Sequence, residues 1–164
     1  MDCKKFGTFK TVEDLNRAAA VQLAEGDIEA VLALAEENGI DKEDALDYIN
    51  GAASELATPR MAALGKLDME VRELKPKLIM EDWVAYIRAC TEEEHFCHMM
   101  FRSEKTLKGC ISQLMKWSFI NMIPVDKDIA KAVGVNVEVK MGIPGMRQAK
   151  QIIREYYTEN KVTL

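Results

Sequence analysis

Three cysteines and two histidines within residues 90–110 are the side chains best suited to metal or redox chemistry. They are Cys90, His95, Cys97, His98 and Cys110. Zinc in a structural site takes four nitrogen or sulfur ligands at the corners of a tetrahedron. On a helix the two histidines share one side and Cys90 shares another with Cys97, so the two pairs diverge. This spacing predicts buried thiols and half-exposed histidines, with a structural zinc site as the weaker alternative.

Other patterns that resemble reactive or ligand-binding sites are incomplete. A catalytic thiol needs a histidine within hydrogen-bond reach, and Cys97 and His98 are chain neighbours that point apart on a helix. The acidic run at residues 36–47 lacks the ligand pattern of a calcium loop. The "GIPG" turn at residues 142–145 lacks the lysine of a phosphate-binding loop. We therefore expect a protein that is not an enzyme and that holds no metal or cofactor.

Composition indicates a folded, water-soluble protein. The chain has 164 residues, of which 48% are hydrophobic and 30% charged, which suits one domain or two very small ones. No uncharged apolar run reaches the ~18 residues that would span a bilayer, and "MDCKKFGTFK" at the start is not a signal peptide. The four cysteines form no CxxC pair. These features predict reduced thiols, no membrane partner and a cytoplasmic location.

Charge is distributed unevenly along the chain. Residues 1–60 contain 6 lysine and arginine residues against 13 aspartate and glutamate residues, a net charge of −7. Residues 61–164 contain 16 against 14, a net charge of +2. Such an asymmetry acts mainly on the choice of partner and on the rate of encounter.

Most of the chain has the pattern of short, capped helices. Each predicted helix has apolar residues three and four positions apart, and most follow a residue that can cap a helix N-terminus. The capping residues are Thr11, Asp27, Asp41, Thr58 and Asp126. The last predicted helix, "MRQAKQIIREYYTEN", is expected to bury Ala149, Ile152 or Ile153, and Tyr156. We expect an acidic helical subdomain over residues 1–57 and a helical main domain over residues 58–164, which can also pack as one domain.

One segment has the alternation of a strand. Val135, Val137, Val139 and Met141 alternate with polar residues. A lone strand must pair with another segment of the chain or with a second copy, which would make a homodimer. The predicted fold class is therefore mainly α, a compact multi-helix domain with at most a short strand or β-hairpin near residues 135–141.

The segment "EKTLKGCISQLMKWSF" (104–119) predicts an amphipathic helix. Its apolar side contains Leu107, Ile111, Leu114 and Ser118, with Cys110 and Trp117 adjoining. The opposite side carries a basic face, which an early helix start would extend to Arg102. The members of this basic face are Arg102, Lys105, Lys108 and Lys116. It is either a solvated surface or one that contacts DNA phosphates or an acidic partner.

Four segments together resemble a known family. They are "LAEENGIDKEDALDYING" (34–51), "ELATPRMAALGKLDMEVRELK" (55–75), "KTLKGCISQLMKWSF" (105–119) and "GIPGMRQAKQIIREYY" (142–157). In this order they resemble small proteins from mobile elements of gut Firmicutes, a group of anti-CRISPR inhibitors of the type II effector nuclease that is related to PcfK-like proteins. The resemblance covers nearly the whole chain, and its segments are helix-packing sequences rather than a catalytic signature.

The resemblance implies a function in the bacterial host cell. The protein would bind the RNA-guided type II nuclease with its guide RNA and block the binding or cleavage of target DNA. That nuclease holds nucleic acid in a positive channel, which an acidic face can occupy in place of phosphates. The expected acidic face consists of Glu36, Glu37, Asp41, Glu43, Asp44 and Asp47. The alternative is a DNA-binding accessory protein of a plasmid or conjugative element, in which the basic face contacts double-stranded DNA.

Overall fold

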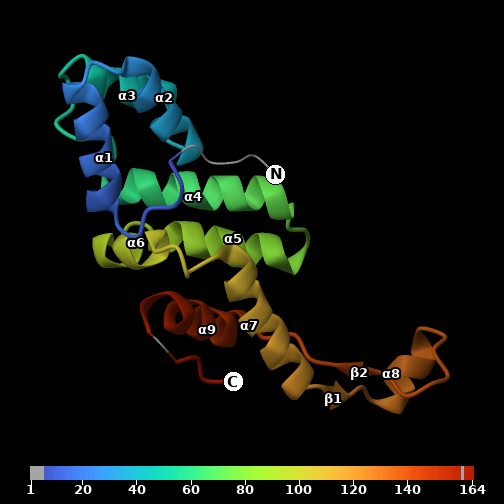
Figure 1. Cartoon of the computed structure of the whole chain (residues 1–164). Helices are drawn as coiled ribbons and strands as arrows, with labels where there is room; N and C mark the ends of the chain where they lie inside the picture. The colour runs from blue at the N-terminus through green and yellow to red at the C-terminus, as the bar shows by residue number, and fades with distance from the viewer. Residues whose placement is uncertain (1–5, 160) are drawn as a thin grey trace. The chain divides into compact units, whose positions relative to one another are not determined.

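The computed structural model describes residues 6–159 and 161–164, and the chain divides into a first unit up to Leu107 and a second unit from Lys108. Within the described residues the fold has nine helices and one two-stranded antiparallel sheet (Figure 1). The predicted fold class, mainly α with a short β-hairpin, is confirmed.

The first unit is built from six helices among its described residues. They are α1 (Val12–Ala24), α2 (Ile28–Glu37), α3 (Lys42–Ile49), α4 (Pro59–Leu74), α5 (Ile79–Cys90) and α6 (Glu94–Phe101). Helix α2 contacts both α1 and α3, and α4 contacts α6 along its length (Figure 1). Helix α4 is the longest of the six, with 16 residues, and the eight-residue α6 packs against it.

The predicted caps account for where these helices begin. Thr11 accepts a hydrogen bond from the backbone N–H of Asp14 at 3.1 Å, and Thr58 accepts one from Met61 at 3.2 Å. Asp27 and Asp41 accept from backbone N–H groups of α2 and α3. Each cap satisfies a donor that has no partner inside its helix.

A hydrophobic core connects α1–α4 and α6. Its fully buried members include Leu15, Leu34 and Leu56. The loop before α4 is fixed to α1 because the side-chain amide of Asn16 donates to the carbonyl of Ala57 at 2.9 Å and accepts from its N–H at 3.0 Å. The predicted boundary after residue 57 therefore lies inside the first unit.

The second unit contains α7 (Leu107–Ile120), which begins at the boundary, α8 (Lys127–Ala132), α9 (Met146–Thr158) and the two strands. Strand β1 (Ile123–Pro124) pairs antiparallel with β2 (Lys140–Met141), with Ile123 opposite Met141. The predicted strand at residues 135–141 thus has its partner within the chain, and regular pairing covers only its last two residues. Helix α8 lies in the loop between the strands and is capped by Asp126, as predicted.

The buried sides of α7 and α9 follow helical spacing. Helix α7 buries Leu107, Cys110, Ile111, Leu114 and Ser118, which confirms the predicted apolar side. Helix α9 buries Ala149, Ile152, Ile153 and Tyr157. The prediction of Tyr156 as a core residue was wrong. Steps of four residues from Ala149 lead to Tyr157, whereas Tyr156 is half-buried and meets the Tyr157 ring edge-on, with the ring centroids 5.0 Å apart.

Candidate functional site

The six carboxylates of the predicted acidic face lie on the end of α2, on α3 and in the turn between them. Five of them are exposed, namely Glu36, Asp41, Glu43, Asp44 and Asp47. The sixth, Glu37, is half-buried and accepts a hydrogen bond from the backbone N–H of Phe6 at 3.2 Å. We call the five exposed residues the acidic surface.

A contact between two glycines holds the acidic surface against the rest of the first unit. A Cβ atom on Gly39, in the α2–α3 turn, would lie 2.5 Å from the carbonyl oxygen of Gly65 on α4. A Cβ on Gly65 would lie 2.6 Å from the carbonyl oxygens of Asn38 and Gly39. Gly39 also has a φ of +71°, a conformation that glycine adopts at little cost. The turn and α4 therefore approach at a distance that only glycine permits at both positions.

The carboxylates of the acidic surface form no ion pairs among the described residues. Over the sequence, residues 1–107 contain 13 lysine and arginine residues against 22 aspartate and glutamate residues, a net charge of −9. Residues 108–164 contain 9 against 5, a net charge of +4. The charge asymmetry therefore follows the division into two units.

The predicted basic face does not form one helical stripe. Helix α7 begins at Leu107, so Arg102 and Lys105 precede it, and Lys105 is only 9% exposed. Arg102 forms an ion pair with Glu104 at 2.6 Å. A backbone hydrogen bond at Glu104, together with the nearby Arg102 charge, holds the pKa of this carboxyl below its ordinary value. Lys108 and Lys116 are exposed on α7, as expected, and they belong to the second unit.

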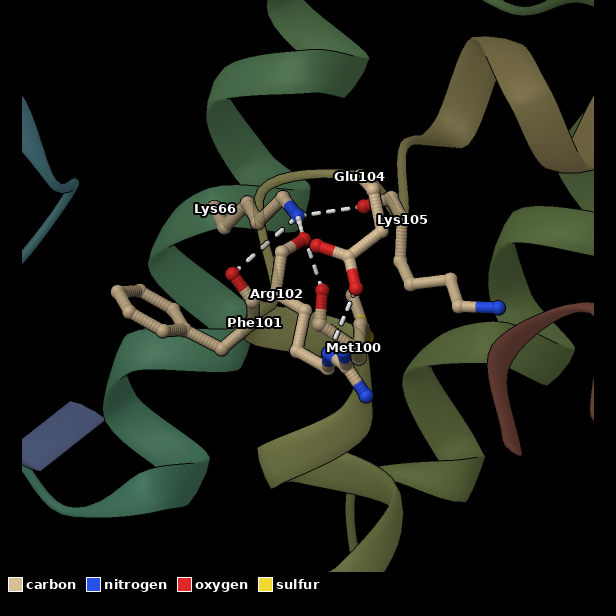
Figure 2. Close-up of polar contacts among 6 residues, drawn as sticks. All are labelled: Lys66, Met100, Phe101, Arg102, Glu104 and Lys105. Carbon is tan, nitrogen blue, oxygen red and sulfur yellow. Dashed lines mark hydrogen bonds and ion pairs between the residues drawn. The ribbon is translucent and has the colours of Figure 1, made fainter. Parts of the chain in front are cut away.

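The turn after α6 explains why Lys105 does not lie on the predicted basic face of α7 (Figure 2). The ammonium of Lys66, on α4, contacts the carbonyl oxygens of Met100 at 2.9 Å and Arg102 at 2.6 Å, and also that of Lys105. The carbonyl of Phe101 lies 3.4 Å away. The last carbonyls of a helix have no partner within it and carry partial negative charge, which a cation stabilises. Lys66 thus ends α6 and folds the following residues into a turn.

We expect Lys66→Met to lower the free energy of unfolding by about 2 kcal/mol, because several carbonyls would lose their hydrogen-bond donor while the apolar stem is preserved. Denaturant unfolding monitored by circular dichroism measures the change. Lys77→Met, at an exposed loop position, is the matched control and should change stability by less than about 0.5 kcal/mol. Equal stability of the two variants would contradict the assigned role of Lys66.

The cysteines and histidines are separated by the fold. Among the described residues, no three side chains of histidine, cysteine, aspartate or glutamate lie close enough together to hold a metal ion. Cys90, Cys97 and Cys110 are all buried. His98 instead lies 3.6 Å from a carboxylate oxygen of Glu13 and 3.7 Å from one of Glu94.

Cys97 is expected to react slowly with alkylating reagents. Burial raises the pKa of its thiol, and its Sγ donates a hydrogen bond to the carbonyl of Thr91 at 3.1 Å. Since the thiolate is the reactive form, labelling at pH 8 should be at least about 100-fold slower than in the unfolded chain. Iodoacetamide labelling followed by peptide mass spectrometry measures the rate. Labelling of Cys97 at the unfolded rate would show that this thiol is accessible.

The same pKa shift has a consequence for stability at high pH. The unfolded thiol loses its proton near its ordinary pKa of 9.0, while the folded thiol keeps it to higher pH. The contribution of the protonated Cys97 thiol to the free energy of unfolding is therefore complete below pH 9, and it is lost as the pH rises through the pKa of the folded state.

A cavity of about 310 Å³ lies within the first unit, beside α4 and the end of α6. Phe9, Met69 and Phe101 supply its apolar lining. Several of its polar side chains already have structural partners. Besides the contacts of Lys66, a carboxylate oxygen of Glu70 accepts a hydrogen bond from the N–H of Leu107 at 2.9 Å. These groups hold the end of α6 and the start of α7 in place.

Comparisons with protein-family models, curated proteins and solved structures give no match to this chain. No helix in the described part of the chain is long and apolar enough to cross a membrane. Functional inference therefore depends on the surfaces of the two units, on their charge and on the resemblance of the four sequence segments.

Proposed function

We propose that this chain is an anti-CRISPR protein, without enzymatic activity, that acts in the bacterial cytoplasm. It binds the RNA-guided type II effector nuclease with its guide RNA, and it blocks the binding or cleavage of target DNA. The acidic surface of the first unit occupies part of the positive channel that otherwise holds nucleic acid. The observation that carries the proposal is the set of five exposed carboxylates with no ion-pair partner among the described residues.

Electrostatics supports this mode of binding. The nuclease recognises its nucleic acids largely through their backbones, in a channel rich in lysine and arginine. On α3, Glu43 and Asp47 are four residues apart, about 6 Å along the helix axis. A nucleic-acid strand carries one charge per about 3.4 Å of axis, so the two charge spacings are of the same order. Complementary charge also accelerates encounter, and added salt should weaken the effect.

The test is a cleavage assay with purified protein, guide-loaded nuclease and target duplex. The proposal predicts loss of cleavage at a near-stoichiometric ratio of protein to nuclease. Cleavage at the full rate in the presence of a hundredfold excess of the protein would refute it for that nuclease. Repeating the assay with several type II nucleases distinguishes a narrow target range from absence of the activity.

The second candidate is a DNA-binding accessory protein of a plasmid or conjugative element. It is favoured by the net charge of +4 in residues 108–164 and by the exposure of Lys108 and Lys116 on α7. Gel-shift assays with duplex DNA distinguish the two candidates. Retardation that is lost in Lys108→Ala/Lys116→Ala, together with unimpaired nuclease cleavage, would favour the accessory protein.

A further inference from the structure

The β-hairpin of the second unit carries a concentration of exposed apolar side chains. Of the 16 large hydrophobic residues exposed in the described chain, seven lie within residues 121–145, which contain the two strands and α8. Met141 is 58% exposed and Val137 is 73% exposed, although both belong to the alternating segment around β2. Exposed apolar side chains at this density mark surfaces that another molecule covers.

The base of the hairpin is fixed to the end of α7. A Cβ atom on Gly142, directly after β2, would lie 2.4 Å from the carbonyl oxygen of Ser118 and 3.0 Å from Met122. The backbone of the hairpin therefore packs directly against the last turn of this helix. The ladder continues past the two strands, because the N–H of Val125 donates to the carbonyl of Val139 at 2.8 Å.

The two outer edges of the hairpin differ in their capacity to accept another strand. Residues of an antiparallel ladder point their backbone groups alternately toward the partner strand and away from it. The Val125–Val139 bond directs the groups of Val139 inward, so those of Lys140 and of its partner Pro124 point outward. Proline has no N–H to donate, which blocks the edge of β1. The edge of β2 keeps its outward N–H and C=O groups at Lys140 and, by the same alternation, at Glu138.

The sequence at this open edge is complementary to itself. In residues 137–141, "VEVKM", an antiparallel pairing of two copies centred on Val139 places Glu138 of each copy opposite Lys140 of the other. The same register places Val137 opposite Met141 and pairs the two copies of Val139 with each other. Glu138 and Lys140 are both exposed. Cross-strand pairs of opposite charge and of apolar residues are the combinations that stabilise sheets.

The direction of the backbone groups is compatible with the same register. Glu138 and Lys140, whose groups point outward, become the hydrogen-bonded pairs between the two copies. The backbone N–H and C=O groups of Val139 point inward. The two copies of Val139 therefore form a close pair at the two-fold axis without hydrogen bonds. Centring the pairing on Glu138 or on Lys140 instead would place like charges opposite one another, and centring it between two residues would lose the agreement of backbone directions.

Helix α8 supplies space for a side chain from the second copy. A cavity of about 240 Å³ lies beside this helix. Its apolar lining includes Val125, Ala130, Val135, Val137 and Val139. The proposed register places Met141 of one copy beside Val137 of the other, and thus next to this cavity. The flexible methionine side chain is well suited to filling such a space. Residues 121–145 also contain three basic and three acidic residues, so two hairpins do not repel each other.

We propose that the chain forms a two-fold homodimer in which β2 of each copy pairs antiparallel with β2 of the other, centred on Val139, to give a four-stranded sheet. The inference does not depend on the proposed function. Because the proposed contact involves one short strand from each copy, we expect the dimer to dissociate reversibly, in the micromolar range.

Sedimentation equilibrium of the full chain and of charge variants tests the proposal. Glu138→Lys or Lys140→Glu alone replaces two attractive pairs with two repulsive ones and should weaken the dimer at least about tenfold. The double variant Glu138→Lys/Lys140→Glu restores opposite charges across the axis and should recover the wild-type dimer. A wild-type chain that stays monomeric at ~500 µM, or a double variant as weak as the single ones, would overturn the proposal.

A disulfide at the axis tests the register independently. Val139→Cys places two thiols at a non-hydrogen-bonded pair, where the Cα atoms lie about 4.5 Å apart, within the range that a disulfide spans. Under mild oxidation this variant should form a covalent dimer, whereas wild type and the exposed control Val133→Cys should not. Equal crosslinking of the two variants, or none at residue 139, would contradict the register. Circular dichroism confirms that each variant is folded.

Discussion

Replacing Gly65 with alanine is expected to lower the free energy of unfolding by about 3 kcal/mol. The substitution disturbs the packing of the α2–α3 turn, which carries part of the acidic surface. The new Cβ would lie 2.6 Å from two backbone carbonyl oxygens, so the α2–α3 turn or α4 must move. Alanine favours helix over glycine by about 1 kcal/mol, which offsets only part of this cost. Denaturant unfolding measures the net change.

Gly145→Ala provides the control for Gly65→Ala. Gly145 has a φ of −61°, and a Cβ there would meet nothing within 4 Å. We therefore expect a change of less than about 1 kcal/mol. If Gly65→Ala were as stable as this control, the close approach of the turn to α4 would not be a requirement of the fold.

Reversing four charges of the acidic surface is expected to reduce inhibition of the nuclease by at least about 100-fold. The variant is Glu36→Lys/Glu43→Lys/Asp44→Lys/Asp47→Lys, and it retains Asp41 because that residue caps α3. If each reversal costs about 0.7 kcal/mol of binding free energy, the sum corresponds to two orders of magnitude in affinity. The concentration that halves cleavage measures the effect.

A second fourfold reversal with the same change in net charge separates position from overall charge. Glu29, Glu55, Glu81 and Asp82 are exposed residues of the first unit with no ion-pair partner among the described residues. Their replacement by lysine should reduce inhibition by less than about tenfold, through the overall field alone. Equal losses in the two variants would show that total charge, and not the acidic surface, determines the activity.

The sequence contained enough local information to predict the helices and their starts. Thr11, Asp27, Asp41 and Thr58 accept the hydrogen bonds expected of N-cap residues. The prediction of Tyr156 in place of Tyr157 shows the limit of this approach, since one residue changes the direction of a side chain by about 100°. Strand β1 was not predicted because two residues, one of them proline, carry no strand pattern.

The contacts that position the candidate surfaces depend on residues far apart in the chain. Gly39 meets Gly65, and Lys66 meets carbonyls that are 34 to 39 residues away. Neither contact is visible in the local pattern of either segment. Lys105 was therefore assigned to a helical stripe, whereas the turn held by Lys66 places it before α7. The acidic surface could be predicted because consecutive caps and exposed carboxylates are local features.

Competition binding to the guide-loaded nuclease tests most directly whether the acidic surface occupies the nucleic-acid channel. Labelled protein is titrated with a catalytically inactive nuclease complex in the presence of increasing target duplex. We expect mutually exclusive binding, in which the apparent Kd of the protein rises in proportion to the concentration of free duplex. An apparent Kd that stays constant while the duplex saturates the nuclease would contradict it.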